Sequence, residues 1–169
     1  MKILKTVMFI GLFVALVTIV VLYFATKKEV HTHFHAGFIV YVNGQKQDYS
    51  DNQYMYLDVC SVIAKQDNND MQIRDMVHLH DNVGDVAHIH EEGATWNMLF
   101  KNMDISFPPD IPIVGYRNGK KVANLLSLSI KPYDSVIFIV GSDKGIDTSH
   151  YVPKQHIVDI EGKANMCGQ

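Results

Sequence analysis

Residues 76–90, MVHLHDNVGDVAHIH, contain two His-x-His pairs on either side of a short polar turn. In a β-strand, residues i and i+2 point to the same face, so His78 and His80 share a face of their strand and His88 and His90 share a face of theirs. If the chain folds back around residues 83–85, His80 lies opposite His88 and His78 lies opposite His90. The spacing therefore predicts a patch of four imidazoles on one face of a hairpin.

A third alternating set, His31, His33 and His35, precedes the apolar run FIVYV. If this segment runs as an extended edge beside the hairpin, seven imidazoles share one surface. Neutral imidazole is a good ligand for zinc, copper, nickel and iron, and a His-x-His pair on a strand can chelate one ion. The candidate metal ligands are therefore His78, His80, His88, His90, His31, His33 and His35. Nearby carboxylates could orient their rings; the candidates are Asp75, Asp81, Asp85, Glu91 and Glu92.

The cluster contains no cysteine, which argues against a closed structural zinc site or a thiolate copper(I) site. We therefore expect Cu(II) or Zn(II) as the bound ion. Two other interpretations stay open: a solvated strand face, and a pH sensor in which protonated imidazoles repel one another. His150 and His156 are isolated and are expected at the surface, and the methionines near the cluster are expected to pack in the core.

The elements that must position these histidines follow from periodicity and turn residues. Thr95 can cap a helix whose residues Trp96, Leu99, Phe100 and Met103 form one apolar face. Asn43-Gly44 and Asn118-Gly119 predict two further hairpins, and SVIFIVG at 135–141 predicts a buried strand. Val77, Leu79, Ala87 and Ile89 should then pack beneath the helix and leave the imidazoles on the opposite face.

This order of strands around one helix resembles the β-grasp architecture. The expected fold class is α+β: an N-terminal transmembrane helix, then a β-grasp-like, mainly antiparallel sheet with one crossing helix. The expected divisions are an anchor at 1–28, a His-rich segment and first hairpin at 29–70, a β-grasp-like domain at 71–141, and an irregular tail at 142–169.

The N-terminal residues 6–26 are uncharged and long enough to cross a bilayer as a helix. Because no good cleavage site follows, we expect an uncleaved single-pass membrane anchor with the C-terminal domain extracytoplasmic. In an oxidising compartment Cys60 and Cys167 could form a disulfide, although their spacing alone leaves this open. The net charge of −3 gives no basic field for nucleic acid.

Residues 31–100 also resemble a group of uncharacterised exported, His-rich archaeal and bacterial proteins. The parts that carry this resemblance are HTHFHAGFIVYVNG, HLHDNVGDVAHIH and TWNMLF. The resemblance implies an extracytoplasmic domain and supplies no activity.

The sequence thus favours a membrane-anchored extracytoplasmic metal-binding protein that captures, buffers or delivers the ion, with a membrane protein or a second copy of the chain as candidate partner. Two alternatives stay open. One is a zinc-dependent hydrolase or hydratase, although no catalytic signature appears. The other is a self-assembling surface protein with metal- or pH-sensitive histidine contacts.

Overall fold

The computed structural model describes residues 16–18, 33–56 and 76–163 of the chain. The chain divides into two compact units, residues 1–31 and 32–169. Within the described residues of the first unit, 16–18 are helical. None of the helices in the described ranges has the length and apolar character needed to cross a membrane. Most of the predicted anchor, the predicted ligand His31 and both cysteines lie outside the described residues.

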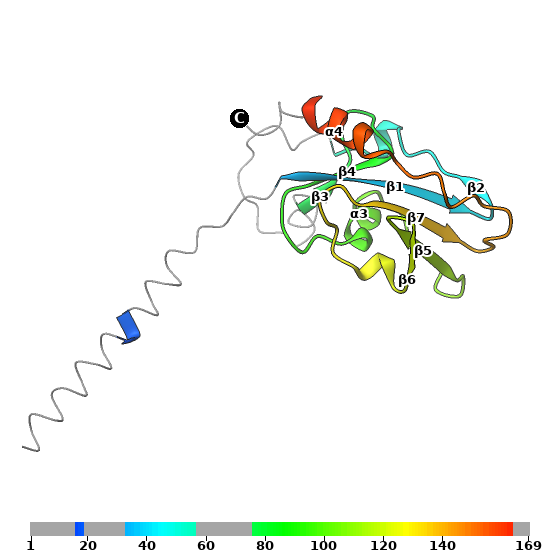
Figure 1. Ribbon diagram of the computed structural model, residues 1–169, viewed down its shortest axis with the longest axis horizontal. Coiled ribbons are helices and arrows are strands. Elements are labelled where there is room, and N and C mark those ends of the chain that lie inside the picture. The colour runs from blue at the N-terminus through cyan, green and yellow to red at the C-terminus, as the bar shows by residue number, and fades with distance from the viewer. Residues whose placement is uncertain (1–15, 19–32, 57–75, 164–169) are drawn as a thin grey trace, which may run out of the picture. The chain divides into compact units, whose positions relative to one another are not determined.

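The second unit is an α+β structure with one seven-stranded mixed sheet (Figure 1). Its strand order is β3-β4-β1-β7-β5-β6, and β2 pairs with β1. Among the strand pairs in the described part of the chain, β1 and β7 pair in parallel and the others are antiparallel. The strands are β1 (Phe34–Val42), β2 (Gln45–Lys46), β3 (Val77–His78), β4 (Val86–Ile89), β5 (Ile113–Arg117), β6 (Lys120–Val122) and β7 (Ser135–Val140).

The predicted hairpin turns form as their sequences require. Asn43 and Gly44 have φ angles of 49° and 83°, and Asn118 and Gly119 have 49° and 82°. These left-handed conformations suit Asn-Gly in the two-residue turns that match strand twist. Each turn joins directly paired strand ends, Val42 with Gln45 and Arg117 with Lys120. Both predicted hairpins are therefore confirmed.

Two helices cover the opposite faces of the sheet (Figure 1). Helix α3 (Trp96–Asn102) begins at Thr95, whose side chain accepts a hydrogen bond from the Met98 amide, as predicted. Helix α4 (Lys154–Lys163) packs Ile157 and Ile160 on the other face. Short 3-10 turns lie at η1 (Asn52–Tyr54) and η2 (Leu125–Ser127). The expectation of an irregular segment at 142–169 was thus wrong for α4.

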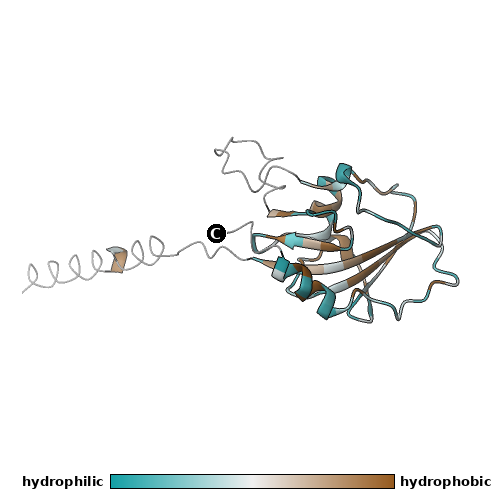
Figure 2. Ribbon diagram, turned by 90° about the horizontal axis from the view of Figure 1, so that it is seen from above, coloured by the Kyte–Doolittle hydropathy of each residue, from teal (hydrophilic) through white to brown (hydrophobic). Residues whose placement is uncertain are grey.

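Strand alternation divides the apolar residues between the two faces. In β7, Val136, Phe138 and Val140 join the core beneath α3, while Ile137 and Ile139 join the core beneath α4. Hydrophobic residues accordingly follow the strands, and polar residues concentrate in the loops and along α4 (Figure 2). The predicted core beneath α3 is confirmed, because every one of its members is present there: Val77, Leu79, Ala87, Ile89, Trp96, Leu99, Phe100 and Met103. Met76 and Met98 pack against the same core.

A buried ion pair fastens the turn before β7. Asp134, which is 3% exposed, accepts hydrogen bonds from Arg117 Nε at 2.9 Å and from the Lys131 amide at 2.9 Å. Arg117 Nη2 lies 2.7 Å from its second oxygen, and Asn118 Nδ2 donates at 3.2 Å. The carboxylate therefore joins β5, the β5–β6 turn and the start of β7.

We expect Asp134→Ala to destabilise the domain by about 3 kcal/mol, because it leaves a half-buried guanidinium and two other donors, the Lys131 amide and Asn118 Nδ2, without their acceptor. Urea unfolding of this variant beside the wild-type protein measures the loss. Asp134→Asn should recover part of it, since the amide keeps one oxygen acceptor. A loss below about 1 kcal/mol would mean that the pair contributes no more than a surface ion pair.

Candidate metal centre

Three histidines form a row across three neighbouring strands. His35 of β1 pairs directly with His88 of β4, and His88 pairs directly with His78 of β3. Directly opposed residues point to the same side of a sheet, so the three rings stand side by side. Their centroids lie 4.5 Å apart for His35–His88 and 5.0 Å apart for His78–His88.

The hairpin register differs from the prediction by two residues. The sequence predicted His78 opposite His90 and His80 opposite His88, whereas His78 pairs with His88 and His80 lies beyond the end of β3. The chain turns earlier than expected, because Asp81 and Asn82 both adopt left-handed conformations with φ of 57°. A shift by two residues keeps every side chain on its face, so the predicted common face is confirmed.

Three more imidazoles surround His88. His33 Nε2 lies 2.9 Å from His88 Nε2, and His80 Nε2 lies 2.5 Å from His88 Nδ1. The His90 ring is centred 4.4 Å from the ring of His88. The structure therefore brings together six of the seven predicted ligands with His88 at their centre, in what we call the histidine cluster: His33, His35, His78, His80, His88 and His90. His33 and His35 lie at the start of the central strand β1, not on the edge segment that the sequence suggested.

The inner rings are buried. The exposed fractions are 0% for His35, 3% for His78 and 0% for His88, whereas His33 is exposed and His80 and His90 are partly buried. The interpretation as a solvated strand face is therefore wrong for these three residues. Burial, with added repulsion from His33, lowers the pKa of His35 to about 4, and burial with repulsion from His78 lowers the pKa of His88 well below its usual range. Both rings are neutral at neutral pH, as metal ligation requires.

His35 has two ring nitrogens that are buried without a hydrogen bond. Buried polar atoms in this state are rare, and each costs about 1–3 kcal/mol. A metal ion would satisfy one of them. Two histidine trios bring their nitrogens within 4.8 Å of one another: His33, His35 and His88, and His78, His88 and His90. Nitrogens bound to one tetrahedral Zn²⁺ at 2.0–2.1 Å stand about 3.3 Å apart, and the 2.9 Å between His33 and His88 requires only a small adjustment to reach that spacing.

Two rings of the histidine cluster have a carboxylate near Nδ1. His80 Nδ1 lies 2.7 Å from Asp81 Oδ2, and His35 Nδ1 lies 3.9 Å from Glu161 Oε1. Glu161 is itself held by the Tyr133 hydroxyl, which donates to Oε2 at 2.7 Å. A hydrogen-bonded carboxylate such as Asp81 fixes the tautomer of its histidine and leaves Nε2 for a metal, whereas Glu161 lies beyond hydrogen-bond distance of His35.

Sequence reasoning named Asp81 as a candidate carboxylate but missed Glu161 and Tyr133. No local signal marks these two residues, because only the packing of α4 brings Glu161 to β1. Of the other predicted carboxylates, Asp85 contacts His156 at 3.1 Å, Glu91 and Glu92 are exposed, and Asp75 lies outside the described residues. His150 is exposed beside Asp147, as expected for a residue outside the site.

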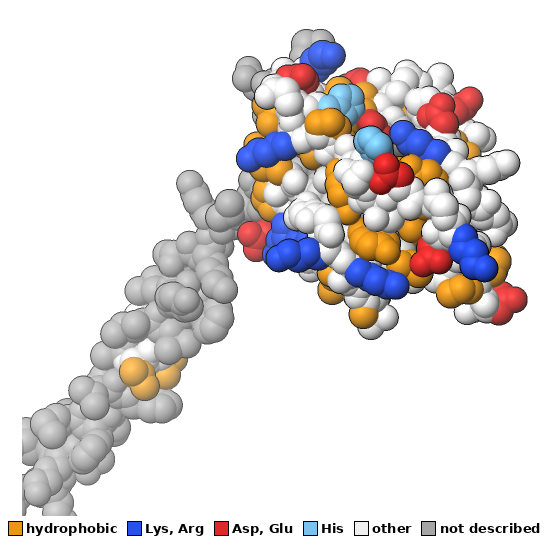
Figure 3. All heavy atoms as spheres, turned by 45° about the vertical axis from the view of Figure 1, so that its right-hand side comes forward, with side chains coloured by type: hydrophobic (Ala, Val, Ile, Leu, Met, Phe, Trp, Pro, Cys, Tyr) orange, Lys and Arg blue, Asp and Glu red, His pale blue; other side chains and the backbone are white. Residues whose placement is uncertain are grey.

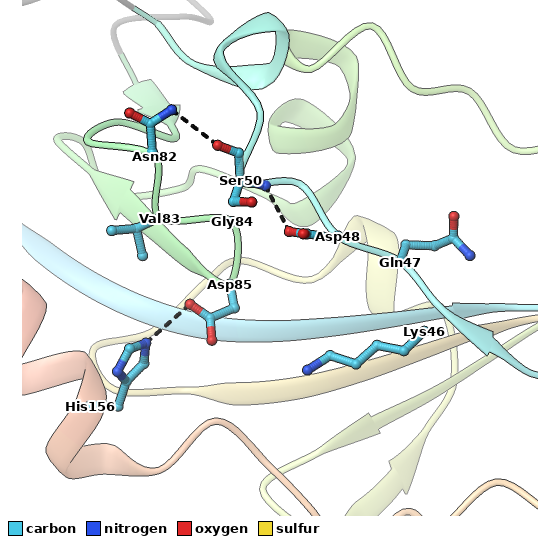
Figure 4. Close-up of a pocket in the computed structure, with 9 residues that line it drawn as sticks. All are labelled: Lys46, Gln47, Asp48, Ser50, Asn82, Val83, Gly84, Asp85 and His156. Carbon is cyan, nitrogen blue, oxygen red and sulfur yellow. Dashed lines mark hydrogen bonds and ion pairs between the residues drawn. The ribbon is translucent and has the colours of Figure 1, made fainter.

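The turn that carries the hairpin is held against residues 46–52. Asn82 Nδ2 donates to the Ser50 carbonyl at 3.1 Å and to Asn52 Oδ1 at 2.6 Å. At Gly84 an added Cβ would lie 2.3 Å from the Ser50 backbone nitrogen, so only glycine permits this approach. These residues border an open polar pocket into which Lys46 and His156 also extend (Figure 4). The contacts fix the hairpin and hence the position of His80 and His88.

Comparison of the chain with protein-family models, with curated proteins and with solved structures finds no significant match.

Proposed function

We propose that this protein binds Cu(II) or Zn(II) through the histidine cluster and serves to capture, buffer or deliver the ion. The observation that carries the proposal is the state of His35: it is wholly buried, its pKa is lowered, and both of its ring nitrogens lack a hydrogen bond. An ion at the centre of the cluster would offset that cost and would be held by neighbouring rings at ligand spacing.

The donor set supports the choice of metal. Within the described residues the cluster supplies imidazole nitrogens alone, with carboxylates only behind the rings. Nitrogen-rich sites suit Cu(II) and Zn(II), whereas magnesium and calcium prefer oxygen ligands.

We further propose that residues 6–26 anchor the chain in a membrane and that the domain is extracytoplasmic. The length and uncharged character of this segment support the anchor, and the resemblance to exported His-rich proteins supports the location. The central parallel pair β1 and β7, with α3 packed across one face, supports a β-grasp-like description of the domain, to which α4 on the opposite face is an addition that the predicted single crossing helix did not include. On the displayed face of the domain, acidic and basic side chains are interspersed (Figure 3). Membrane fractionation followed by protease digestion of intact cells tests anchor and orientation together.

Calorimetric titration of the full chain in detergent with Cu(II) and with Zn(II) tests the metal proposal. We expect saturable binding, and at a free ion concentration 100 times Kd the domain should gain about 2.7 kcal/mol of stability, which a chelator removes. The double variant His78→Ala/His80→Ala, which removes two rings of the cluster, should bind less of the ion than the wild-type protein.

The matched control is His150→Ala/His156→Ala, which removes as many imidazoles outside the cluster and should bind like the wild-type protein. Equal binding by both double variants, with both folded by circular dichroism, would overturn the proposal.

A further inference from the structure

His88 occupies an unusual position, because both of its ring nitrogens face other imidazoles. Nε2 lies 2.9 Å from His33 Nε2, and Nδ1 lies 2.5 Å from His80 Nε2. A ring buried to 0% exposure is thus approached by a metal-ligating nitrogen at each end. The same residue is shared by the two trios, His33, His35 and His88 on one hand and His78, His88 and His90 on the other.

The number of rings exceeds the need of a single ion. Zinc in proteins takes four ligands in a closed site and three plus water in an open one. Six imidazoles stand within the cluster, and ring centroids of five neighbours lie 4.4–5.0 Å from that of His88. Two ions that share His88 would each have two or three further imidazoles.

We propose that the cluster binds two metal ions bridged by His88 as an imidazolate. This inference rests on the proposed metal binding and adds its stoichiometry and its bridging ligand. One ion is bound at Nε2 of His88 with His33 and His35. The second is bound at Nδ1 with His80, and His78 and His90 complete its ligands.

Formation of the imidazolate bridge releases one proton from His88. Neutral His88 has a lone pair on one ring nitrogen and a hydrogen on the other. Binding of the second ion displaces that hydrogen as a proton to the buffer, so that each nitrogen presents a lone pair to one ion. No oxidant or reductant is needed, because both ions keep their charge.

Two carboxylates are placed where they can orient rings of the two proposed ion sites. Asp81 accepts from Nδ1 of His80 and so directs Nε2 of that ring to His88. Glu161, held by Tyr133, stands beside Nδ1 of His35 on the other side. Each proposed ion site thus has one ring with a carboxylate near its Nδ1, at hydrogen-bond distance from His80 and 3.9 Å away from His35.

Copper loading of the full chain tests the proposal through two readouts, elemental analysis and electron paramagnetic resonance. We expect two Cu(II) per chain and far fewer detectable spins than bound ions, because an imidazolate bridge couples the two unpaired electrons antiferromagnetically.

Two single variants that spare His88 sharpen the test. His33 is exposed and His80 is partly buried, so His33→Ala and His80→Ala should leave the domain folded. Each should reduce the content to one Cu(II) per chain and restore the full spin signal. His150→Ala, outside the cluster, should retain two coupled ions.

The results that would contradict the bridge differ from those that would contradict metal binding. Two ions with full spin intensity, or one ion in the wild-type chain, would overturn the bridge while leaving metal binding in place. No bound ion would overturn both the bridge and the proposed function.

Discussion

His88→Gln is expected to weaken Cu(II) and Zn(II) binding by more than about 100-fold, which exceeds the loss typical of removing a residue that only hydrogen-bonds to a metal ligand. His88 belongs to both trios and is the ring that the other five surround. Its loss removes one candidate ligand from each of the two trios. Glutamine is near in size and keeps a polar group in the cluster, so the change in affinity reports ligation more than packing.

Calorimetric titration of this variant measures the loss, and thermal unfolding without metal establishes that the domain is intact. His156→Gln provides a matched control, because that ring lies outside the cluster beside Asp85. Retention of wild-type affinity by a folded His88→Gln protein would remove His88 from the site.

Acid is expected to destabilise the metal-free domain strongly between pH 6.5 and pH 4. His35 has an ordinary pKa of 6.5 in the unfolded chain, and burial with neighbouring His33 lowers it to about 4 in the folded domain. Between these values the unfolded chain binds more protons, so the contribution of His35 to stability is complete above pH 6.5, falls as the pH is lowered, and levels off below pH 4. His35 alone accounts for about 3 kcal/mol of this change, and the lowered pKa of His88 acts in the same direction.

Urea unfolding across this window, in the presence of a chelator, measures the effect. His35→Gln should flatten the slope, whereas His150→Gln, at an exposed position, should leave it unchanged. A wild-type stability that stays constant from pH 6.5 to pH 4 would contradict the assigned burial of a neutral His35. With metal present, protons compete for the same nitrogens, so the loss should be steeper.

Local patterns predicted the strands and the helix that carry the site, since these depend on neighbours in sequence. Thr95 caps α3, the Asn-Gly turns join their strands, and Ser135–Val140 is a buried strand. The alternation of side chains along the strands also correctly predicted that the imidazoles lie on the face opposite the core. A change of register by two residues leaves each side chain on the same face. The register itself depended on the turn, and the left-handed pair Asp81 and Asn82 was not recognised.

Features that arise from distant packing were not predictable. Helix α4 buries only Ile157 and Ile160 among charged and polar residues, which gives a weak periodic signal. Its docking brings Glu161 beside His35, and no local pattern links these residues. The same holds for Asp134, whose partner Arg117 lies on another strand. The central position of β1 follows from its parallel pairing with β7, a contact between distant parts of the chain.

Strand β4 is buried along its whole length, Val86–Ile89, with His88 on one side and Ala87 and Ile89 on the other. No position on it faces water, so no substitution there is free of consequence for either the apolar interior or the ligands. Within the histidine cluster, side chains can consequently change without altering this strand only at the periphery, at His33, His80 and His90.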